Sequence, residues 1–331
     1  MRRFLCFVLC VFSLAVFAQK TSVQKVGSQK TNKILLEEQE QKQEKRTRND
    51  QEKCGVTMPL RVAGFSIYPP FGWVEDISPS YDIKKHYISK GVFADIFQQV
   101  VAQTGIVRTR YSNIGYPSFQ ESYASLQKGA IDFFLGFYYD QTMFHPELRL
   151  VYPSLLQNPF VVVFVKGKER TVRSFNDLKG LTGIVRQEEL VYPLIYKKVP
   201  ASTKLVRVSG AQNAYLKLLS GEADFMITSQ YANEAEMRRF KLIDKLFVPS
   251  VALFKAEMFI MANKNSPCYD SLKDKIGDIL RAYKKDNVIE QKIIEGIDNW
   301  GILFKDEPGL EVPVKEKTSD KNTPPVIVQP A

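Results

Sequence analysis

The residues best suited to contact a ligand stand directly after the first strand-like stretch, in the sequence YPPFGW at 68–73. A plain turn needs no aromatic rings, and prolines are excluded from the centre of a sheet. Prolines do stiffen a loop, which lets rings form a wall with little ordering cost. Tyr68, Phe71 and Trp73 are therefore candidate ligand contacts. Packing between the loop and the next helix is the alternative interpretation.

A second aromatic group follows a later strand-like stretch that begins near Asp132. Phe137, Tyr138 and Tyr139 stand at its carboxyl end, and ligands of open α/β sheets bind beyond the carboxyl ends of strands. We expect Tyr138 and Tyr139 to form a second wall of a binding site, whereas core packing explains Phe137 equally well.

Residue types typical of catalysis are sparse. The chain has two histidines, and its sequence has neither metal-ligand spacing nor a nucleophile elbow. Glu188 or His145 would be the candidates for acid–base work, if buried. The formal charge of +10 is scattered and forms no basic stripe interleaved with aromatic residues, which argues against a nucleic-acid partner. The sequence thus contains no convincing catalytic constellation, and we expect neither an enzyme nor a metal site or cofactor.

The N-terminal residues 1–18 have the pattern of a secretory signal peptide. Arg2 and Arg3 precede an apolar run, and small-residue spacing ends at Ala18. A membrane anchor is the alternative, although the run is shorter than the roughly 20 residues of a membrane span. We expect a periplasmic or secreted protein. Cys54 and Cys268 remain after cleavage, and in an oxidising compartment they either pair or stay as two unrelated thiols.

The rest of the chain divides by composition. Residues 19–53 are almost entirely polar and are expected to be a disordered linker, and the proline- and charge-rich residues 306–331 a disordered tail. Between them strand and helix patterns alternate, which predicts an α/β fold with largely parallel sheets. The expected strands are 60–67, 106–112, 131–137, 160–166, 181–185, 204–208, 223–228 and 257–262. The expected helices are 91–104, 119–128, a short one from 174, one through 196, 211–219, 271–287 and 288–297.

An internal repeat supports two similar lobes. Residues 122–137 and 214–229 each read as a helix, a glycine, a turn, an aspartate and a hydrophobic strand. Asp132 and Asp224 hold the same place, about 90 residues apart. The alternative is a coincidence of common α/β patterns. In either case we expect both aspartates to fix turns rather than touch a ligand.

The order of these motifs resembles that of extracytoplasmic solute-binding proteins of family 3, which include amino-acid receptors of ABC transporters. The matching segments are YPPF, GVFADI, LQKGAIDFFLG, VYPSLLQNPFVVVFVKG, DLKGLTGIVR and LLSGEADFMITS. The resemblance covers nearly all of 60–300. It implies a periplasmic binding protein type II-like α/β fold, with two lobes joined by two crossover strands. Lobe 1 would comprise 54–155 and 262–305, and lobe 2 would comprise 160–252. It also implies a ligand between the lobes, closure about a hinge, and a membrane permease as partner.

Three positions depart from that family's amino-acid clamp. His145 stands where the family places a carboxylate-binding arginine, although it could equally be a surface histidine without a ligand role. Ser229 stands where the family places an aspartate for the amino group. In lobe 2, Glu188 and Glu189 would repel a carboxylate that Arg186 could partly hold. The alternative is that two acids in the first turn of a helix only stabilise that helix. We expect a small polar or aromatic solute, for ABC-type uptake or sensing, with an atypical clamp. The alternatives are a non-transport sensor or protein-interaction module on the same fold and, third, a dehydratase-like enzyme. The unusual insertion 75–90 would either cover the cleft or decorate the surface.

Overall fold

The computed structural model describes residues 54, 59–78, 87–106, 109–111, 119–139 and 145–311. The predicted signal peptide and linker lie outside the described residues, as do residues 79–86 of the insertion. At the other end the described chain continues beyond the expected start of the tail at Asp306. There the Leu310 N–H donates to the Phe240 carbonyl at 2.9 Å. The folded part therefore extends to about Leu310, a few residues further than the sequence predicted.

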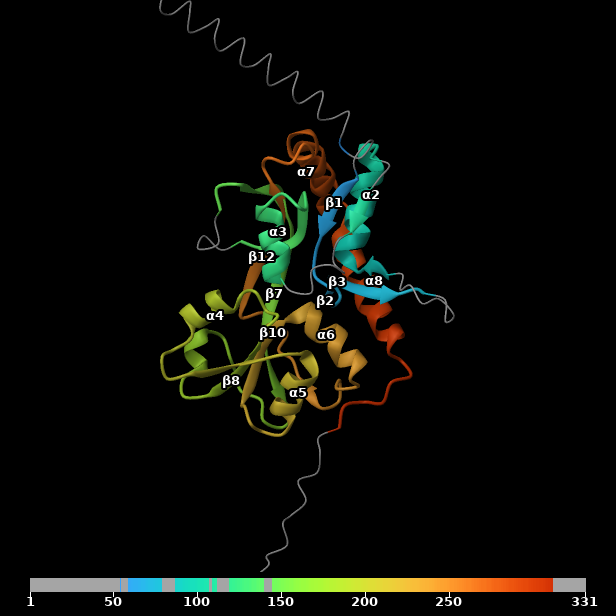
Figure 1. Cartoon of the computed structure of the whole chain (residues 1–331). Helices are drawn as coiled ribbons and strands as arrows, with labels where there is room; N and C mark the ends of the chain where they lie inside the picture. The colour runs from blue at the N-terminus through green and yellow to red at the C-terminus, as the bar shows by residue number, and fades with distance from the viewer. Residues whose placement is uncertain are drawn as a thin grey trace, which may run out of the picture.

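One large sheet runs through the described part of the molecule (Figure 1), in the order β5-β1-β6-β12-β7-β10-β8-β9, with β11 paired to β7. The strands on the β5 side are β5 (Thr109–Tyr111), β1 (Leu60–Ala63), β6 (Phe133–Tyr138) and β12 (Phe254–Asn263). Those on the other side are β7 (Leu148–Val165), β10 (Phe225–Ser229), β8 (Thr182–Arg186), β9 (Lys204–Val208) and β11 (Leu246–Phe247). β1 pairs in parallel with β5 and β6, and β8 pairs in parallel with β10 and β9. In the middle of the sheet β12 and β7 pair antiparallel.

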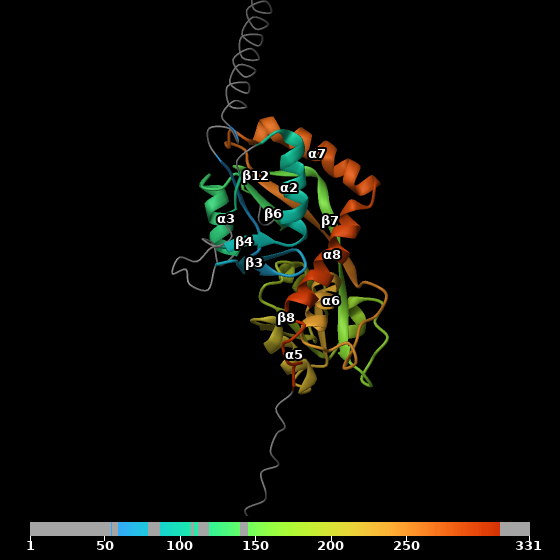
Figure 2. The ribbon, with the colours of Figure 1, turned by 90° about the vertical axis from the view of Figure 1, so that its right-hand side faces the viewer.

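The helices divide the molecule into two lobes. Lobe 1 carries α2 (Val92–Thr104), α3 (Phe119–Gln127), α7 (Tyr269–Lys285) and α8 (Val288–Leu303). Lobe 2 carries the short η3 (Phe175–Leu178), α4 (Tyr192–Lys198), α5 (Ala211–Leu219) and α6 (Gln230–Arg239). Figure 2 shows β7 running from one lobe into the other, and β12 returns beside it. The fold is therefore α/β with two lobes joined by two crossover strands, as the resemblance implied. The prediction of largely parallel sheets was wrong, because β7 and β12 pair antiparallel with each other and with their other neighbours.

The two copies of the sequence repeat are equivalent in the structure. In lobe 1 the Asp132 N–H donates to the Arg61 carbonyl at 2.8 Å, and the Arg61 N–H donates to Asp132 Oδ2 at 2.8 Å. In lobe 2 Asp224 and Thr182 exchange the same two bonds, each at 2.8 Å. Each aspartate thus fastens the start of the strand after a helix (β6 or β10) to its parallel neighbour (β1 or β8). Both aspartates fix turns, as expected, and the repeat is a β-α-β unit used twice.

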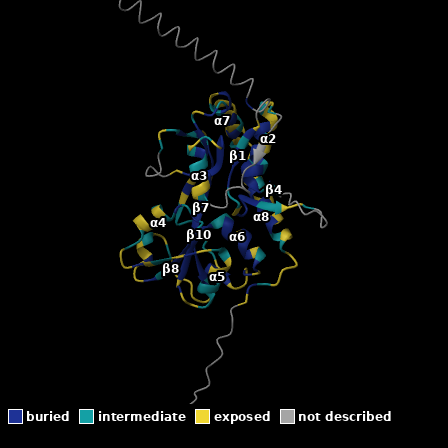
Figure 3. Ribbon diagram, in the orientation of Figure 1, coloured by how far each residue is buried: buried dark blue, intermediate teal, exposed yellow. Residues whose placement is uncertain are grey.

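The remaining elements attach to lobe 1. A small antiparallel sheet of β2 (Ile67–Tyr68), β3 (Gly72–Asp76) and β4 (Tyr87–Lys90) contains the YPPFGW stretch and both described ends of the insertion. A disulfide joins Cys54 to Cys268, with Cα atoms 5.3 Å apart, at the start of α7. Figure 3 shows that the buried residues follow the large sheet and the helix faces turned toward it. Among the described helices none is long and apolar enough to cross a membrane.

Candidate functional site

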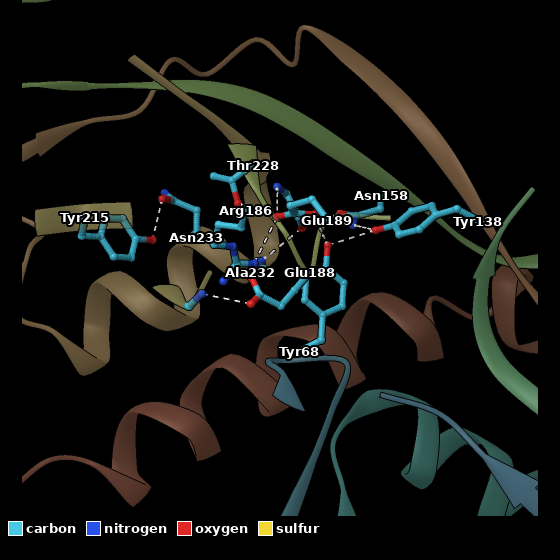
Figure 4. A network of polar contacts seen from close by, with 12 residues as sticks. Tyr68, Tyr138, Asn158, Arg186, Glu188, Glu189, Tyr215, Thr228, Ala232 and Asn233 are labelled. Atoms are coloured by element: carbon cyan, nitrogen blue, oxygen red, sulfur yellow. Dashed lines mark hydrogen bonds and ion pairs between the residues drawn. The ribbon is translucent and has the colours of Figure 1, made fainter. Parts of the chain in front are cut away.

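The carboxyl ends of four strands, two from each lobe, face one another where the lobes meet. Tyr68 follows β1, Tyr138 ends β6, Arg186 ends β8 and Ser229 ends β10. All four side chains belong to one buried polar network (Figure 4). The rule that α/β sheets place ligand-contacting groups beyond their strand ends therefore locates this site.

Glu189 is at the centre of the network and is fully buried, with 0% of its surface exposed. Its Oε2 accepts a hydrogen bond from the Tyr68 hydroxyl at 2.7 Å. Its Oε1 accepts from Thr228 Oγ1 at 2.8 Å, Arg186 Nη2 at 3.1 Å and the Ser229 N–H at 3.3 Å. Because Tyr68 belongs to lobe 1 and the other donors to lobe 2, this one carboxylate bonds the two lobes together.

A second chain of hydrogen bonds joins the network to the crossover strand β7. The hydroxyls of Tyr68 and Tyr138 lie 3.1 Å apart. Asn158, in the middle of β7, donates from Nδ2 to the Tyr138 hydroxyl and accepts at Oδ1 from Ser229 Oγ at 2.8 Å. Ser229 Oγ also accepts the Ala232 N–H at 3.2 Å and so caps α6. Both lobes and one crossover strand therefore meet in a continuous polar contact.

The charge states follow from burial and from the central carboxylate. Burial, followed by the charge of Glu189, raises the pKa of both Tyr68 and Tyr138 well above the ordinary 10.0. Both hydroxyls therefore stay protonated at neutral pH. Burial alone would lower the pKa of Arg186, but the charges of Glu189 and Glu236 raise it. Arg186 and Glu189 form an ion pair whose side chains are 6% and 0% exposed.

Glu188 lies next to the central carboxylate but makes different contacts. Its Oε1 accepts the Gly210 N–H at 2.9 Å, at the N-terminus of α5. Its Oε2 is buried without a hydrogen-bond partner among the described residues. A carboxylate at a helix N-terminus stabilises that helix, so the geometry gives Glu188 a role inside lobe 2.

The other predicted site residues are placed outside the network. Phe71 is fully buried and stacks on Phe93 of α2 with ring centroids 5.1 Å apart. Trp73 packs edge-on against Trp300 of α8 at 5.3 Å, and its Nε1 donates to Glu75 at 2.7 Å. These contacts correspond to the alternative interpretation of the YPPFGW stretch, in which its rings pack against helices.

Tyr139 and His145 lie further from the network. Tyr139 is 43% exposed and lies beside Phe259 of β12. His145 Nδ1 accepts the Glu147 N–H at 3.2 Å, just before β7 begins at Leu148. Leu148 and Asn158 are ten strand residues apart, which corresponds to about 33 Å. No hydrogen bond links His145 to the polar network among the described residues.

The network includes three residues that sequence reasoning missed, Glu189, Asn158 and Thr228. Glu189 was interpreted together with Glu188 as the first turn of a helix. The chain instead makes an irregular turn after β8, and α4 begins only at Tyr192. Asn158 and Thr228 carried one available signal, because each is a polar residue within an otherwise apolar strand sequence. Such residues need a buried partner.

A cavity of about 310 Å³ opens beside Glu188, between the two lobes. This size is at the lower end of the roughly 300–1,000 Å³ of small-molecule pockets. Residues of both lobes line it: Gly64, Phe65, Ser66, Ile67, Phe119, Gln120 and Phe134 from lobe 1, and Gln187, Glu188, Leu190 and Arg207 from lobe 2. A wider surface groove of about 840 Å³ lies between β9 and α5, within lobe 2 alone. The described residues contain no cluster of histidine, cysteine and acidic side chains that could hold a metal ion.

Comparison with known proteins places the fold. No protein-family model and no curated protein sequence matches the chain. Among solved structures, the chain is similar to the amino-acid ABC transporter substrate-binding protein AbpA from Streptococcus pneumoniae bound to L-arginine. The TM-score is 0.57 and the identity 16%, over 75% of this chain and 98% of AbpA.

Two further structures share the architecture. The periplasmic VFT2 domain of BvgS from Bordetella pertussis has a TM-score of 0.55 and 18% identity, over 76% of this chain and 97% of that domain. An ancestral amino-acid-binding protein, a precursor of cyclohexadienyl dehydratase, has a TM-score of 0.55 and 17% identity, over 75% of this chain and 98% of the ancestral protein. At such identities the likeness concerns the fold alone. The chain has the two-lobed periplasmic binding protein type II fold.

Proposed function

We propose that the protein binds a small polar or aromatic solute between its lobes, outside the cytoplasm, for uptake or sensing. The observation that carries this proposal is the cavity of about 310 Å³ that both lobes line next to the four converging strand ends. A ligand in contact with both lobes stabilises their closed arrangement, because closure adds contacts that the open form lacks. Uptake would also need a membrane permease that recognises the closed form.

The polar network argues against an ordinary α-amino acid as the solute. Arg186 and the Ser229 N–H are anion-binding groups, but Glu189 already engages both. A ligand carboxylate placed there would meet a second carboxylate in a buried site, which is electrostatically unfavourable. The solute is therefore expected to use the cavity beside the network rather than the network itself.

The proposal is for binding without catalysis. Glu188 and His145 were the acid–base candidates, and the structure places them in a helix-start contact and at the far end of β7. The hydroxyl beside Glu188 is that of Ser209, whose Oγ donates to Glu188 Oε1 at 3.4 Å, and His145 Nδ1 accepts a backbone N–H. Turnover of a prephenate-like acid that is abolished by Glu188→Gln would instead support the dehydratase-like alternative.

A thermal-shift screen with amino acids, polyamines, sugars and aromatic acids tests the proposal. A solute at 100 times its Kd is expected to stabilise the protein by about 2.7 kcal/mol. Gln187→Trp puts a bulky ring at the exposed edge of the cavity and should abolish this shift. Gln212→Trp, the same exchange on the exposed surface of α5, should preserve it. No shift with any class of compound would contradict the proposal.

A second candidate function, a sensor or protein-interaction module without a solute, is favoured by the direct contact between the lobes. The Tyr68 hydroxyl of lobe 1 donates to Glu189 of lobe 2, and Arg238 of α6 pairs with Asp298 of α8. These bonds join the lobes through groups of the chain itself. A failed solute screen, combined with specific capture of a protein partner that surface mutations abolish, would support this second function.

A further inference from the structure

The cavity between the lobes has two chemically different sides. On lobe 1, Phe65, Phe119 and Phe134 form a continuous aromatic wall. The ring centroids of Phe65 and Phe134 are 5.8 Å apart, and those of Phe119 and Phe134 are 5.6 Å apart, both edge to face. Phe134 is buried, with 1% of its surface exposed, while Phe65 and Phe119 are only partly buried. A flat apolar group in the cavity would gain both burial and ring contacts.

On lobe 2 the cavity presents a guanidinium group. Arg207 of β9 lies over the ring of Tyr192, with its Cζ 4.6 Å from the ring centroid. Its Nη2 donates to the Gln187 carbonyl at 3.3 Å, and the described residues include no acidic ion-pair partner for it. Stacking and one carbonyl contact hold the group in place, yet leave other N–H donors available. A fixed, unpaired guanidinium is suited to a carboxylate, which it can bind through two parallel hydrogen bonds.

The cavity offers little to a ligand ammonium group. Glu188 is the carboxylate in its lining, but Oε1 is engaged by the Gly210 N–H and Oε2 is sealed from solvent. The neighbouring carboxylate, Glu189, is fully buried and accepts four hydrogen bonds inside the network. Among the described lining residues, a ligand cation would therefore find Arg207 and only a carboxylate that already accepts hydrogen bonds from its own lobe.

We propose that the cavity binds an aromatic carboxylate that lacks an α-ammonium group, with its ring on Phe65, Phe119 and Phe134 and its carboxylate on Arg207. This inference rests on the proposed function, because it names the chemical class of the solute. The ring and the acid of one ligand would then bridge the lobes, since the aromatic wall belongs to lobe 1 and the guanidinium to lobe 2.

Isothermal titration calorimetry on the full mature chain tests the inference with three probes of matched shape. They are 3-phenylpropanoate, 3-phenylpropylamine and L-phenylalanine. The acid should bind, the amine should not, and L-phenylalanine should bind at least about tenfold more weakly because its ammonium group is unpaired. Arg207→Gln should lower the affinity for 3-phenylpropanoate by about 10- to 100-fold, as expected for loss of a charge-assisted hydrogen bond. Lys204→Gln, which removes an exposed positive charge from the same strand outside the cavity, should leave the affinity unchanged.

The outcomes separate this inference from the proposed function. Acid binding that is equal in the wild type and Arg207→Gln would overturn the inference. Binding of the amine or of a sugar would also overturn the inference. If Gln187→Trp abolishes that binding, the ligand occupies the cavity and the proposed function stands. If none of the acids, amines, amino acids or sugars binds, the proposed function fails and the inference fails with it. A circular dichroism spectrum and a melting curve for each variant establish that a lost affinity does not come from misfolding.

Discussion

Substituting Glu189 by alanine should destabilise the protein more than any other single change in the polar network. The substitution leaves Arg186 buried without its ion pair and removes the acceptor of the Tyr68 and Thr228 hydroxyls. Removing one partner of a buried ion pair costs about 3–5 kcal/mol. For a folded part of this size, each kcal/mol lowers the melting temperature by about 2–4 °C. The expected decrease is therefore about 6–20 °C.

Scanning calorimetry of Glu189→Ala beside Glu188→Ala measures this effect against a matched control. Glu188 has the same side chain one residue earlier, but it accepts only the Gly210 N–H and a long hydrogen bond from Ser209 Oγ at the start of a helix, so its loss should cost only about 1 kcal/mol. Replacing the pair together, as Arg186→Met with Glu189→Leu, should recover much of the lost stability because no unpaired charge remains. Equal melting temperatures for Glu189→Ala and Glu188→Ala would refute the central role of Glu189.

Three further predictions follow from contacts away from the cavity. Trp73→Ala should lower the free energy of unfolding by about 3–5 kcal/mol in chemical denaturation, because Trp73 packs on Trp300. The affinity for solute should stay unchanged, because Trp73 does not line the cavity. Unchanged stability together with lost binding would show instead that Trp73 contacts the ligand. The raised pKa values of Tyr68 and Tyr138 mean that the folded state keeps protons that unfolded tyrosines release near pH 10, so stability is present below that pH and is lost as pH rises above it. Replacing both by phenylalanine should make this alkaline decline shallower by about 1.4 kcal/mol per pH unit for each tyrosine, measured by urea midpoints, and an identical slope would contradict the assignment. Cys268→Ser opens a loop of 214 residues and should lower the free energy of unfolding by about 3–5 kcal/mol, whereas unchanged stability under oxidising conditions would argue against the disulfide.

The fold was predictable wherever apolar spacing and strand-ending residues agreed. The patterns for β9 and α5 give the observed bounds, 204–208 and 211–219. The helix α6 was missed because its buried face is made of Ala232, Asn233, Ala235, Glu236 and Met237. Small and polar side chains give no apolar periodicity, and α6 is buried because it packs against α8 and the sheet.

The crossover strand β7 shows a different limit. The sequence predicted strand only over 160–166, whereas the strand begins at Leu148 and includes Pro153 and Pro159. Prolines disfavour a strand because they remove a ladder hydrogen bond. Long pairing with β12 on one side compensates for the missing donors, and pairing partners this distant in sequence are invisible to local patterns.

The candidate site was predictable in place but not in detail. Strand ends identified Tyr68 and Tyr138, and the resemblance to family 3 implied Arg186 and Ser229. The structure brings these four side chains into one network. Which of two adjacent glutamates turns inward depends on the irregular backbone after β8, and the sequence carries no rule for it. The same limit applies to Trp73, whose alternation along β3 is compatible with either face until α8 is in place.

A crystal structure of the protein with the solute found in the screen tests the central claim most directly. The account predicts ligand density in the cavity between Phe134 and Arg207, in contact with both lobes, with the hydrogen bond between Tyr68 and Glu189 intact. Density in the groove between β9 and α5, which Arg207 also borders, would contradict it. So would a ligand that displaces Glu189 from Arg186.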